Sequence, residues 1–215
     1  MRSSPRSGNG VSARPTEIVV VRHGETEWSR TGRHTGRTDV PLTDQGRRDA
    51  EAVGIALRER RFALVLTSPL QRAKETCRLA GLGDVALERD DLQEWDYGYY
   101  EGRTTTEIRL ERPGWTVWKD GVPGGETLAE VGARVDRVLD ELREAAGDVA
   151  VFAHGHLLRV LAARWLGLEP IAGRLFALDP GSISVLGHER ETAVLRSWNV
   201  RPGGILLEQT QAHQA

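Results

Sequence analysis

The chain has 215 residues, 39% hydrophobic and 28% charged, which is enough apolar material for one α/β domain with an excursion or for two very small domains. The 29 basic and 31 acidic residues leave a formal net charge of -2, which argues against a general nucleic-acid binder. The single cysteine, Cys77, excludes internal disulfides and multi-cysteine zinc sites, and no apolar run reaches the roughly 18 residues of a membrane span.

The two ends of the chain are polar. Residues 1–15 are rich in Ser, Gly and Arg and lack the apolar stretch of a secretory signal, so we expect a disordered tail on a cytoplasmic protein. Residues 208–215 are expected to fray. Residues 16–207 then form a single domain.

The first half of this domain alternates between apolar runs and helical patterns. Glu17–Val21 is a continuous apolar run typical of a buried parallel strand, and Thr43–Arg60 predicts a helix with Thr43 as its N-cap. Phe62–Thr67 predicts a second buried strand. A helix from Pro69 at its first position to about Ala80, and a short strand at Val85–Leu87, follow.

The pattern breaks between Trp95 and Gly125, where three tyrosines and three tryptophans gather with Gly and Pro. Within this segment Thr104–Glu111 predicts a short helix. Its aromatic content favours an excursion that lies over the active site rather than a linker. Five of its aromatic residues either cap the sheet or form a substrate wall: Tyr97, Tyr99, Tyr100, Trp115 and Trp118.

Helical periodicity returns at Glu126–Ala146, before a fourth buried strand at Val149–Ala153. Leu157–Leu166 predicts a helix closed by Gly167, and Ser182–Gly187 with Thr192–Trp198 predicts paired strands. Strands that alternate with helices predict an α/β fold, a three-layer sandwich with a mostly parallel central sheet and helices on both faces.

Charged and titratable side chains follow the predicted strands. Arg22 and His23 come directly after the first strand, Arg72 follows the second by one turn, Glu94 follows the third and His154 the fourth. Because ligands of open α/β sheets bind beyond the carboxyl ends of strands, we expect these groups to converge. Arginine matches phosphate oxygens with a planar fork, so the cluster predicts a pocket for a phosphate dianion. Helices that begin near Pro69 and Gly155 would add N-terminal dipoles.

These residues lie in sequence blocks that resemble the histidine phosphatase superfamily, in the branch that contains cofactor-dependent phosphoglycerate mutases. The blocks are Arg22-His23-Gly24-Glu25-Thr26, Thr35–Thr43, Ser68–Ala73, Leu92–Gly98 and Ala153–His156. They occur in the family's order and span roughly residues 17 to 200. The resemblance implies a phosphoglycerate mutase-like fold.

The resemblance also implies a mechanism. His23 would attack phosphorus and form a phosphohistidine, while Arg22, Arg72 and His154 hold the phosphoryl oxygens. Glu94 would protonate the leaving alkoxide and then take a proton from the hydrolytic water. No metal or cofactor is required, because the arginines supply the positive charge. Further substrate contacts are expected at Ser29, Thr35, Gly36, Tyr97, Gly155 and His156.

Several residues have competing interpretations. Glu101 is the nearest rival of Glu94 as the proton donor, and Glu25 is expected to be structural. His154 and His156 resemble a metal pair, but no third ligand has a suitable spacing. The isolated His34, His188 and His213 are expected to be ordinary surface or core histidines, and Cys77 to be inert packing.

Phosphatase and mutase share the phosphohistidine and differ in the acceptor of its phosphoryl group. Mutases of the family carry an adjacent arginine pair after the acid, whereas Gly98–Gly125 holds Arg103, Arg109 and Arg112 without such a pair. Ser29 stands where the family more often has Asn, and its shorter side chain leaves room for water. Both differences favour hydrolysis. The block from Glu94 to Gly102 looks most like the acid phosphatase and sedoheptulose-bisphosphatase-like members.

The expected activity is therefore hydrolysis of a small phosphorylated metabolite of the sugar phosphate class, with no nucleic-acid or membrane partner. A phosphoglycerate mutase is the alternative enzyme, and a catalytically silent phosphoester-binding protein is the third interpretation. Dimers occur among relatives, so both a homodimer and a monomer stay open.

Overall fold

The computed structural model describes residues 17–202, which form one α/β sandwich built on a six-stranded sheet. The predicted tail at 1–15, the predicted frayed end at 208–215 and His213 lie outside the described residues. The strands are β1 (Ile18–Arg22), β2 (Leu64–Thr67), β3 (Leu87–Glu88), β4 (Val149–Ala153), β5 (Ile183–Glu189) and β6 (Thr192–Val200). Their order across the sheet is β3-β2-β4-β1-β5-β6.

The sheet is mostly parallel, as expected. The strands β3, β2, β4 and β1 pair in parallel, whereas β5 runs antiparallel to both β1 and β6. The parallel pairing of β1 with β4 places Arg22, the last residue of β1, opposite Ala153 at the end of β4. The side chains that follow these two strands therefore start from neighbouring points at one edge of the sheet.

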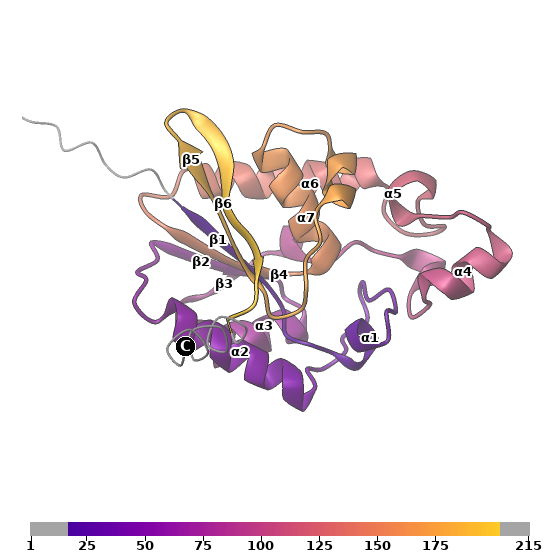
Figure 1. Ribbon diagram of the computed structural model, residues 1–215, viewed down its shortest axis with the longest axis horizontal. Helices are drawn as coiled ribbons and strands as arrows, with labels where there is room; N and C mark the ends of the chain where they lie inside the picture. The colour runs from indigo at the N-terminus through magenta and orange to yellow at the C-terminus, as the bar shows by residue number, and fades with distance from the viewer. Residues whose placement is uncertain (1–16, 203–215) are drawn as a thin grey trace, which may run out of the picture.

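Helices cover both faces of the sheet, which confirms the three-layer prediction (Figure 1). The helices are α1 (Glu27–Arg30), α2 (Asp44–Leu57), α3 (Gln71–Leu79), α4 (Thr105–Glu111), α5 (Val117–Asp120), α6 (Leu128–Arg143) and α7 (Gly155–Trp165). Short 3-10 turns lie at Gly83–Val85, Asp90–Leu92, Gly98–Tyr100 and Pro170–Leu175. In Figure 1, α2 and α3 lie on one side of the sheet and α6 and α7 on the other.

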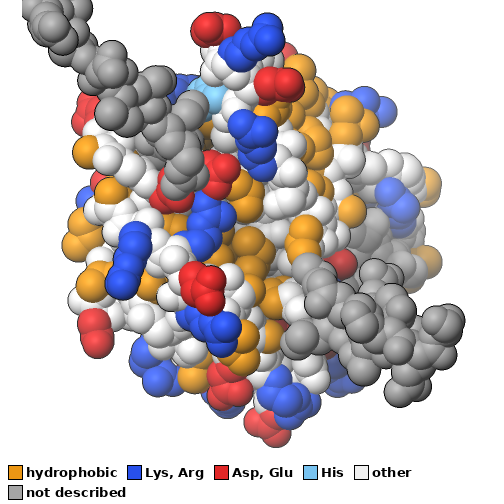
Figure 2. Space-filling model, turned by 60° about the vertical axis from the view of Figure 1, so that its left-hand side comes forward, with side chains coloured by type: hydrophobic (Ala, Val, Ile, Leu, Met, Phe, Trp, Pro, Cys, Tyr) orange, Lys and Arg blue, Asp and Glu red, His pale blue; other side chains and the backbone are white. Residues whose placement is uncertain are grey.

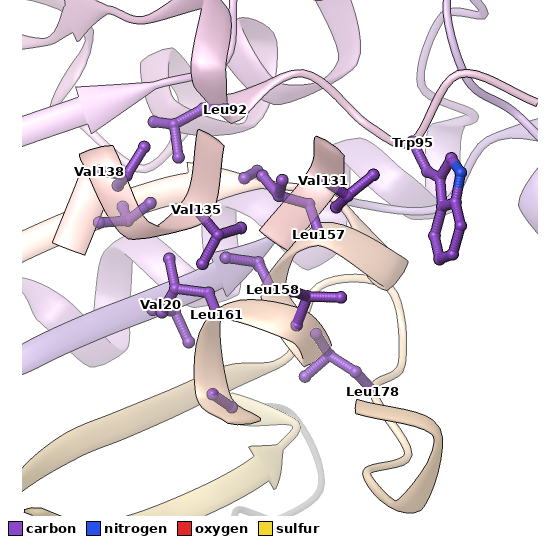
Figure 3. Close-up of a cluster of buried hydrophobic side chains, with 14 of the residues drawn as sticks. Val20, Leu92, Trp95, Val131, Val135, Val138, Leu157, Leu158, Leu161 and Leu178 are labelled. Carbon is purple, nitrogen blue, oxygen red and sulfur yellow. The ribbon is translucent and has the colours of Figure 1, made fainter. Parts of the chain in front are cut away.

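Alternation along the strands supplies a core on each face. Val19 and Val21 of β1 pack toward α2 and α3 with Val53 and Cys77, while Ile18 and Val20 belong to the larger cluster under α6 and α7. Figure 3 shows part of this larger cluster, with Leu92 and Trp95 beside side chains of α6 and α7. These two residues flank Glu94, so the segment that carries the predicted acid is anchored in the core on both sides.

Local signals in the sequence account for most helix ends. Thr43 accepts a hydrogen bond from the Gly46 N–H at the start of α2, as predicted. Thr104 and Thr127 form capping boxes at the starts of α4 and α6. Gly167, with φ at 72°, follows the end of α7 in the left-handed conformation that glycine tolerates.

Several predicted boundaries differ by two or three residues, among them the end of α2, which lies at Leu57 rather than Arg60. The helix expected to begin at Pro69 begins at Gln71, because the Asp39 carboxylate accepts the Gln71 N–H there, 2.8 Å away. The helix expected from Leu157 begins at Gly155, two residues earlier. The strand expected at Val85–Leu87 is a 3-10 turn followed by β3 at Leu87–Glu88, which pairs with the last two residues of β2.

The predicted excursion projects from one end of the molecule, where α4 and α5 lie beyond α1 and away from the β5–β6 hairpin (Figure 1). Figure 2 shows a face on which Lys and Arg side chains are interspersed with Asp and Glu, in keeping with the net charge of -2. Among residues 17–202, no helix combines the length and hydropathy that a membrane span requires.

Candidate active site

A cavity of about 380 Å³ opens at the carboxyl ends of β1 and β4. Its wall combines residues that follow the strands with residues of the excursion and of α7. Its wall includes eight of the residues expected from the sequence: Arg22, His23, Ser29, Thr35, Glu94, Tyr97, Gly155 and His156. Arg72, His154 and Gly36 are not part of this wall.

His23 is held in one tautomer. Its Nδ1 lies 2.8 Å from the carbonyl oxygen of Gly24, which can only accept, so Nδ1 carries the ring proton and Nε2 keeps a lone pair. His23 is 4% exposed. Burial, followed by the charges of Arg72 and Arg22, lowers the pKa of this imidazole well below 6.5. A neutral ring with a free Nε2 is the form that attacks an electrophile.

Arg22 supplies a cation whose hydrogen bonds are incomplete. Its Nη1 donates to the Leu178 carbonyl, whereas its buried Nε has no partner among residues 17–202. An unpaired donor that is buried costs free energy, so this nitrogen fits a bound anion. The absence of a side chain at Gly155 permits the arrangement, because a Cβ there would lie 3.2 Å from the Arg22 Cζ.

Glu94 sits at the N-terminus of α7. Its Oε1 accepts the N–H groups of Trp95 and Leu157, each at 2.9 Å, and its Oε2 accepts that of His156 at 3.0 Å. His154 at the N-cap position makes no side-chain cap, so Glu94 takes over this function for the first turn of α7. The carboxyl group is thereby fixed at the cavity wall, 5% exposed.

Behind Glu94, Arg134 of α6 fixes the main chain. Its Nη1 donates to the carbonyls of Asp91 and Gln93 at 2.8 and 2.7 Å, and its Nη2 to that of Glu94 at 3.2 Å. The same guanidinium binds Glu126 through Nε and Nη2 at 2.7 and 2.9 Å. Arg134 therefore positions Glu94 without facing the cavity, a function that sequence reasoning missed.

Arg72 and His154 lie behind the cavity wall and are fully buried. Arg72 donates through Nε to Nδ1 of His154 at 3.1 Å, so His154 carries its proton on Nε2, 2.7 Å from the Ser68 hydroxyl. The other Arg72 donors reach the carbonyls of Thr35, Gly36 and Thr38. The His154 and His23 rings are 5.2 Å apart. This pair thus supports His23 from behind.

Burial lowers the pKa of His154 well below 6.5, and the Arg72 charge lowers it further. Since the pKa of His23 is depressed by the same causes, the two neighbouring rings are both neutral near pH 7. The Arg72 guanidinium is then the charged member of the group behind the wall.

The predicted contacts at residues 29–36 differ in their available donors. Ser29 and Thr35 line the cavity, but the Ser29 hydroxyl donates to the Thr26 carbonyl at 3.0 Å and the Thr35 hydroxyl to the Arg33 carbonyl at 3.1 Å. The Gly36 N–H donates to Glu101 at 2.8 Å. The hydroxyls already have internal partners, and Gly36 lies away from the cavity.

Glu101 and Glu25, the other two glutamates considered from the sequence, serve loops. Glu101 accepts the N–H groups of Gly36 and Thr38 at 2.8 and 3.0 Å, and Glu25 accepts the Thr43 hydroxyl at 2.8 Å. Neither lines the cavity. Glu94 is therefore the carboxylate that the structure places beside His23 and Arg22.

Tyr97 and His156 form a hydrogen-bonded pair in the cavity wall, with Tyr97 Oη 2.6 Å from His156 Nδ1. Burial raises the pKa of Tyr97 well above 10, so the phenol donates and His156 carries its own proton on Nε2. Burial lowers the pKa of His156 well below 6.5, so this ring is neutral. Trp115 and Trp118 also line the cavity, whereas Tyr99 and Tyr100 do not.

His34, expected to be an ordinary surface or core histidine, is buried. It lines the cavity, its ring 4.8 Å from Tyr97 and 5.4 Å from Trp115, and burial lowers its pKa to about 4. Sequence reasoning also missed Arg33, Arg109 and Arg159. Arg159 had a detectable signal, because it lies one helical turn after Gly155 on the same helix.

The remaining side chains with reactive or ligating groups lie elsewhere. Cys77 is buried in α3 within the core, and burial raises the pKa of its thiol to about 12. Within the described residues, no three or more His, Cys, Asp or Glu side chains gather in a way that could hold a metal ion. His188 lies on β5, its ring 4.9 Å from Trp165.

Comparison with known proteins places this site in a family. Residues 18–201 match the profile of the histidine phosphatase superfamily, branch 1. The chain is 42% identical over 192 residues to an acid phosphatase of Mycobacterium tuberculosis, covering 86% of this chain and 94% of that protein. It is 38% identical over 183 residues to sedoheptulose 1,7-bisphosphatase of Saccharomyces cerevisiae, covering 70% and 67%.

A solved structure of a Mycobacterium tuberculosis open reading frame superposes with a TM-score of 0.83 at 40% identity, covering 87% of this chain and 98% of that one. A mycobacterial glucosyl-3-phosphoglycerate phosphatase superposes with a TM-score of 0.78 at 28% identity, covering 86% and 99%.

Proposed function

The chain belongs to the histidine phosphatase superfamily, branch 1, and we propose that it is a metal-independent phosphomonoesterase that hydrolyses a small sugar phosphate through a phosphohistidine on His23. The observation that carries this proposal is the hydrogen bond between His23 Nδ1 and the Gly24 carbonyl. It leaves Nε2 free to attack, in a cavity where the Nε of Arg22 also lacks a partner among the described residues. Relatives named for phosphatase activity on sugar phosphates support the substrate class.

In the first step His23 Nε2 bonds to phosphorus while the bond from phosphorus to the ester oxygen breaks. Arg22 stabilises the negative charge on the phosphoryl oxygens, and the N-terminus of α7 at Gly155 contributes its dipole. Glu94 donates a proton to the leaving oxygen, so an alcohol departs. Arg72 and His154, which lie next to His23, are expected to hold the phosphoryl oxygens with Arg22.

In the second step Glu94, now a carboxylate, takes a proton from water. The resulting oxygen nucleophile attacks phosphorus, the bond to Nε2 breaks, and inorganic phosphate leaves. Both steps return His23 and Glu94 to their starting forms. No step draws on a metal, because the guanidinium group carries the positive charge.

A phosphorus NMR time course in EDTA tests the proposal. The sample contains 3-phosphoglycerate, a trace of 2,3-bisphosphoglycerate and sedoheptulose 1,7-bisphosphate, with the His23→Ala variant as control. We expect inorganic phosphate to grow well beyond the amount of enzyme, and the ester that shrinks identifies the substrate. A 2-phosphoglycerate signal with little free phosphate would make the protein a mutase, and phosphate release no greater than the enzyme concentration would make it a binding protein.

A cytoplasmic location and the choice between homodimer and monomer stay predictions from the sequence. Cell fractionation tests the first, and light scattering of the purified protein tests the second.

A further inference from the structure

Part of the cavity wall is built from aromatic rings and arginines. Trp118 of α5 lies 5.2 Å from the His156 ring, and Trp115 lies 5.4 Å from the His34 ring. Two arginines, Arg109 of α4 and Arg159 of α7, line the cavity together with these four rings.

Arg159 is held in place by contacts that leave one of its terminal nitrogens free for a ligand. Its Cζ lies 4.7 Å from the centre of the Trp118 ring, and its Nε and Nη2 donate to the carbonyls of Gly173 and Arg174 at 3.1 and 3.3 Å. Its Nη1 has no hydrogen-bond partner among residues 17–202. The guanidinium is half-buried, and stacking on an indole together with two carbonyl contacts fixes its orientation.

Arg109 reaches the same wall from the excursion. Its Nε donates to the Trp115 carbonyl at 2.8 Å, which leaves both terminal nitrogens without a partner in the described part of the chain. Arg33, by contrast, donates to the Gly102 carbonyl and lies 3.6 Å from the Glu107 carboxylate. No carboxylate among residues 17–202 forms an ion pair with Arg109 or Arg159.

The charges of the cavity wall are unbalanced. Four arginines line it, against the single carboxylate of Glu94, and the lining histidines His23, His34 and His156 are neutral near pH 7. One phosphoryl group bound at Arg22 and His23 leaves the positive charges of Arg109 and Arg159 without an anionic partner. A ligand with a second anionic group would compensate them.

We propose that the substrate carries a second anionic group, a phosphate or a carboxylate, which Arg109 and Arg159 bind within the same cavity while the transferred phosphoryl group lies at His23. This inference rests on the proposed function and narrows it. Arg159 follows Gly155 by four residues of α7, so its Cα stands about 6 Å further along the helix. A short carbon chain between two anions suits a cavity of about 380 Å³, and the indole rings offer apolar faces to its carbons.

The test compares matched substrates with one and two anionic groups. 3-Phosphoglycerate is paired with glycerol 3-phosphate, which lacks the carboxylate, and fructose 1,6-bisphosphate is paired with fructose 6-phosphate. The readout is the ratio of kcat/KM within each pair, measured on the same enzyme sample. Because both members see the same fraction of folded enzyme, a variant that folds poorly does not change the ratio.

In the wild type we expect kcat/KM to be about tenfold or more higher for the member with two anionic groups in at least one pair. The pair that shows this preference distinguishes a carboxylate from a phosphate as the second group. Arg159→Met should reduce the ratio by about 10-fold to 100-fold, and Arg109→Met, which is exposed and screened by solvent, by less. Arg112→Met is the control: this exposed arginine of the same excursion contacts the Tyr100 hydroxyl outside the cavity wall and should leave the ratio unchanged.

A wild-type ratio near one for both pairs, or a preference that survives both substitutions, would overturn the second anion site while leaving a phosphatase. Failure of the wild type to hydrolyse any of the four esters, or p-nitrophenyl phosphate, would overturn the proposed function itself. The two failures are therefore distinguishable.

Discussion

His23 donates its Nδ1 proton to the carbonyl oxygen of Gly24, the next residue in the chain, over 2.8 Å. A main-chain oxygen cannot change its role from acceptor to donor, so this contact sets the tautomer whatever the substrate. The backbone of its own motif therefore fixes the tautomer of His23. Burial and the neighbouring arginine charges keep the ring neutral.

The protonation of His23 can be observed directly. Burial, then Arg72 and Arg22, lower its pKa well below 6.5, so NMR of the labelled imidazole should show protonated Nδ1 and unprotonated Nε2 from neutral pH to well below that value. Arg72→Met removes one of the causes and should raise the pKa. His23→Gln assigns the resonance. A doubly protonated ring at pH 7, or a proton on Nε2, would contradict the account.

Stability should fall as the pH drops through about 6.5, the ordinary pKa of a histidine. His23, His34 and His154 are buried, and burial lowers the pKa of each in the folded protein, that of His34 to about 4. Below about 6.5 the unfolded chain takes up protons that the folded protein does not, so each histidine removes about 1.4 kcal/mol of unfolding free energy per pH unit. For His34 this loss continues until about pH 4.

Urea unfolding at about pH 7.5 and about pH 5.5 checks this, since the interval spans the unfolded pKa. His34→Gln should have a smaller loss by about 1.4 kcal/mol over that interval. Equal losses in wild type and variant would mean that folding does not lower the pKa of His34.

Glu94→Gln should slow the hydrolysis of alkyl phosphates far more than that of p-nitrophenyl phosphate, because the p-nitrophenolate leaving group hardly needs a proton. The amide oxygen can still accept the N–H groups of Trp95 and Leu157, so the first turn of α7 keeps most of its cap. We expect the two losses in kcat/KM to differ by about 100-fold or more. Glu101→Gln is the matched comparison, since Glu101 accepts loop N–H groups away from the cavity. Equal losses on both substrates would assign the proton transfer to another group.

Arg134 should act on catalysis through Glu94 alone. Arg134→Lys loses the fork that reaches the carbonyls of Asp91, Gln93 and Glu94, and should show the leaving-group pattern of Glu94→Gln in weaker form. Arg134→Met leaves the Glu126 carboxylate, whose side chain is 17% exposed, without its ion-pair partner. This substitution should lower the free energy of unfolding by about 3–5 kcal/mol.

Replacing both Arg134 and Glu126 by Met separates folding from positioning, because it removes the stranded charge. This double variant should regain stability but keep the leaving-group defect. If instead it hydrolyses alkyl and aryl esters in the wild-type ratio, Arg134 is purely structural.

The sequence predicted the parts of the fold that local patterns encode. Continuous apolar runs located β1, β2 and β4, and the threonine cap at Thr43 located the start of α2. The start of α3 was missed because its cap comes from Asp39, distant in the chain. The strand β3 was misplaced because both of its residues are exposed, so no buried apolar run marks it.

For the site, the strand ends and the family motifs together predicted that His23, Arg22 and Glu94 lie close together. The assignment of Arg72 and His154 to the phosphate stays a prediction. In the structure the Arg72 donors meet carbonyls that only folding brings near. His34 and Arg109 could not be predicted, because their positions depend on how residues 95–125 fold over the sheet. An isolated polar residue in such a segment has no periodicity to place it.

The most direct test of the account is to trap the phosphorylated enzyme. The protein is mixed with p-nitrophenyl phosphate in EDTA, quenched in alkali, in which phosphohistidine survives, and digested for peptide mapping by mass spectrometry. We predict one phosphoryl group, on His23, with a burst of p-nitrophenol that matches it, and neither in His23→Ala. Turnover with no phosphorylated residue, or with the phosphoryl group on His154 or His156, would contradict the central claim.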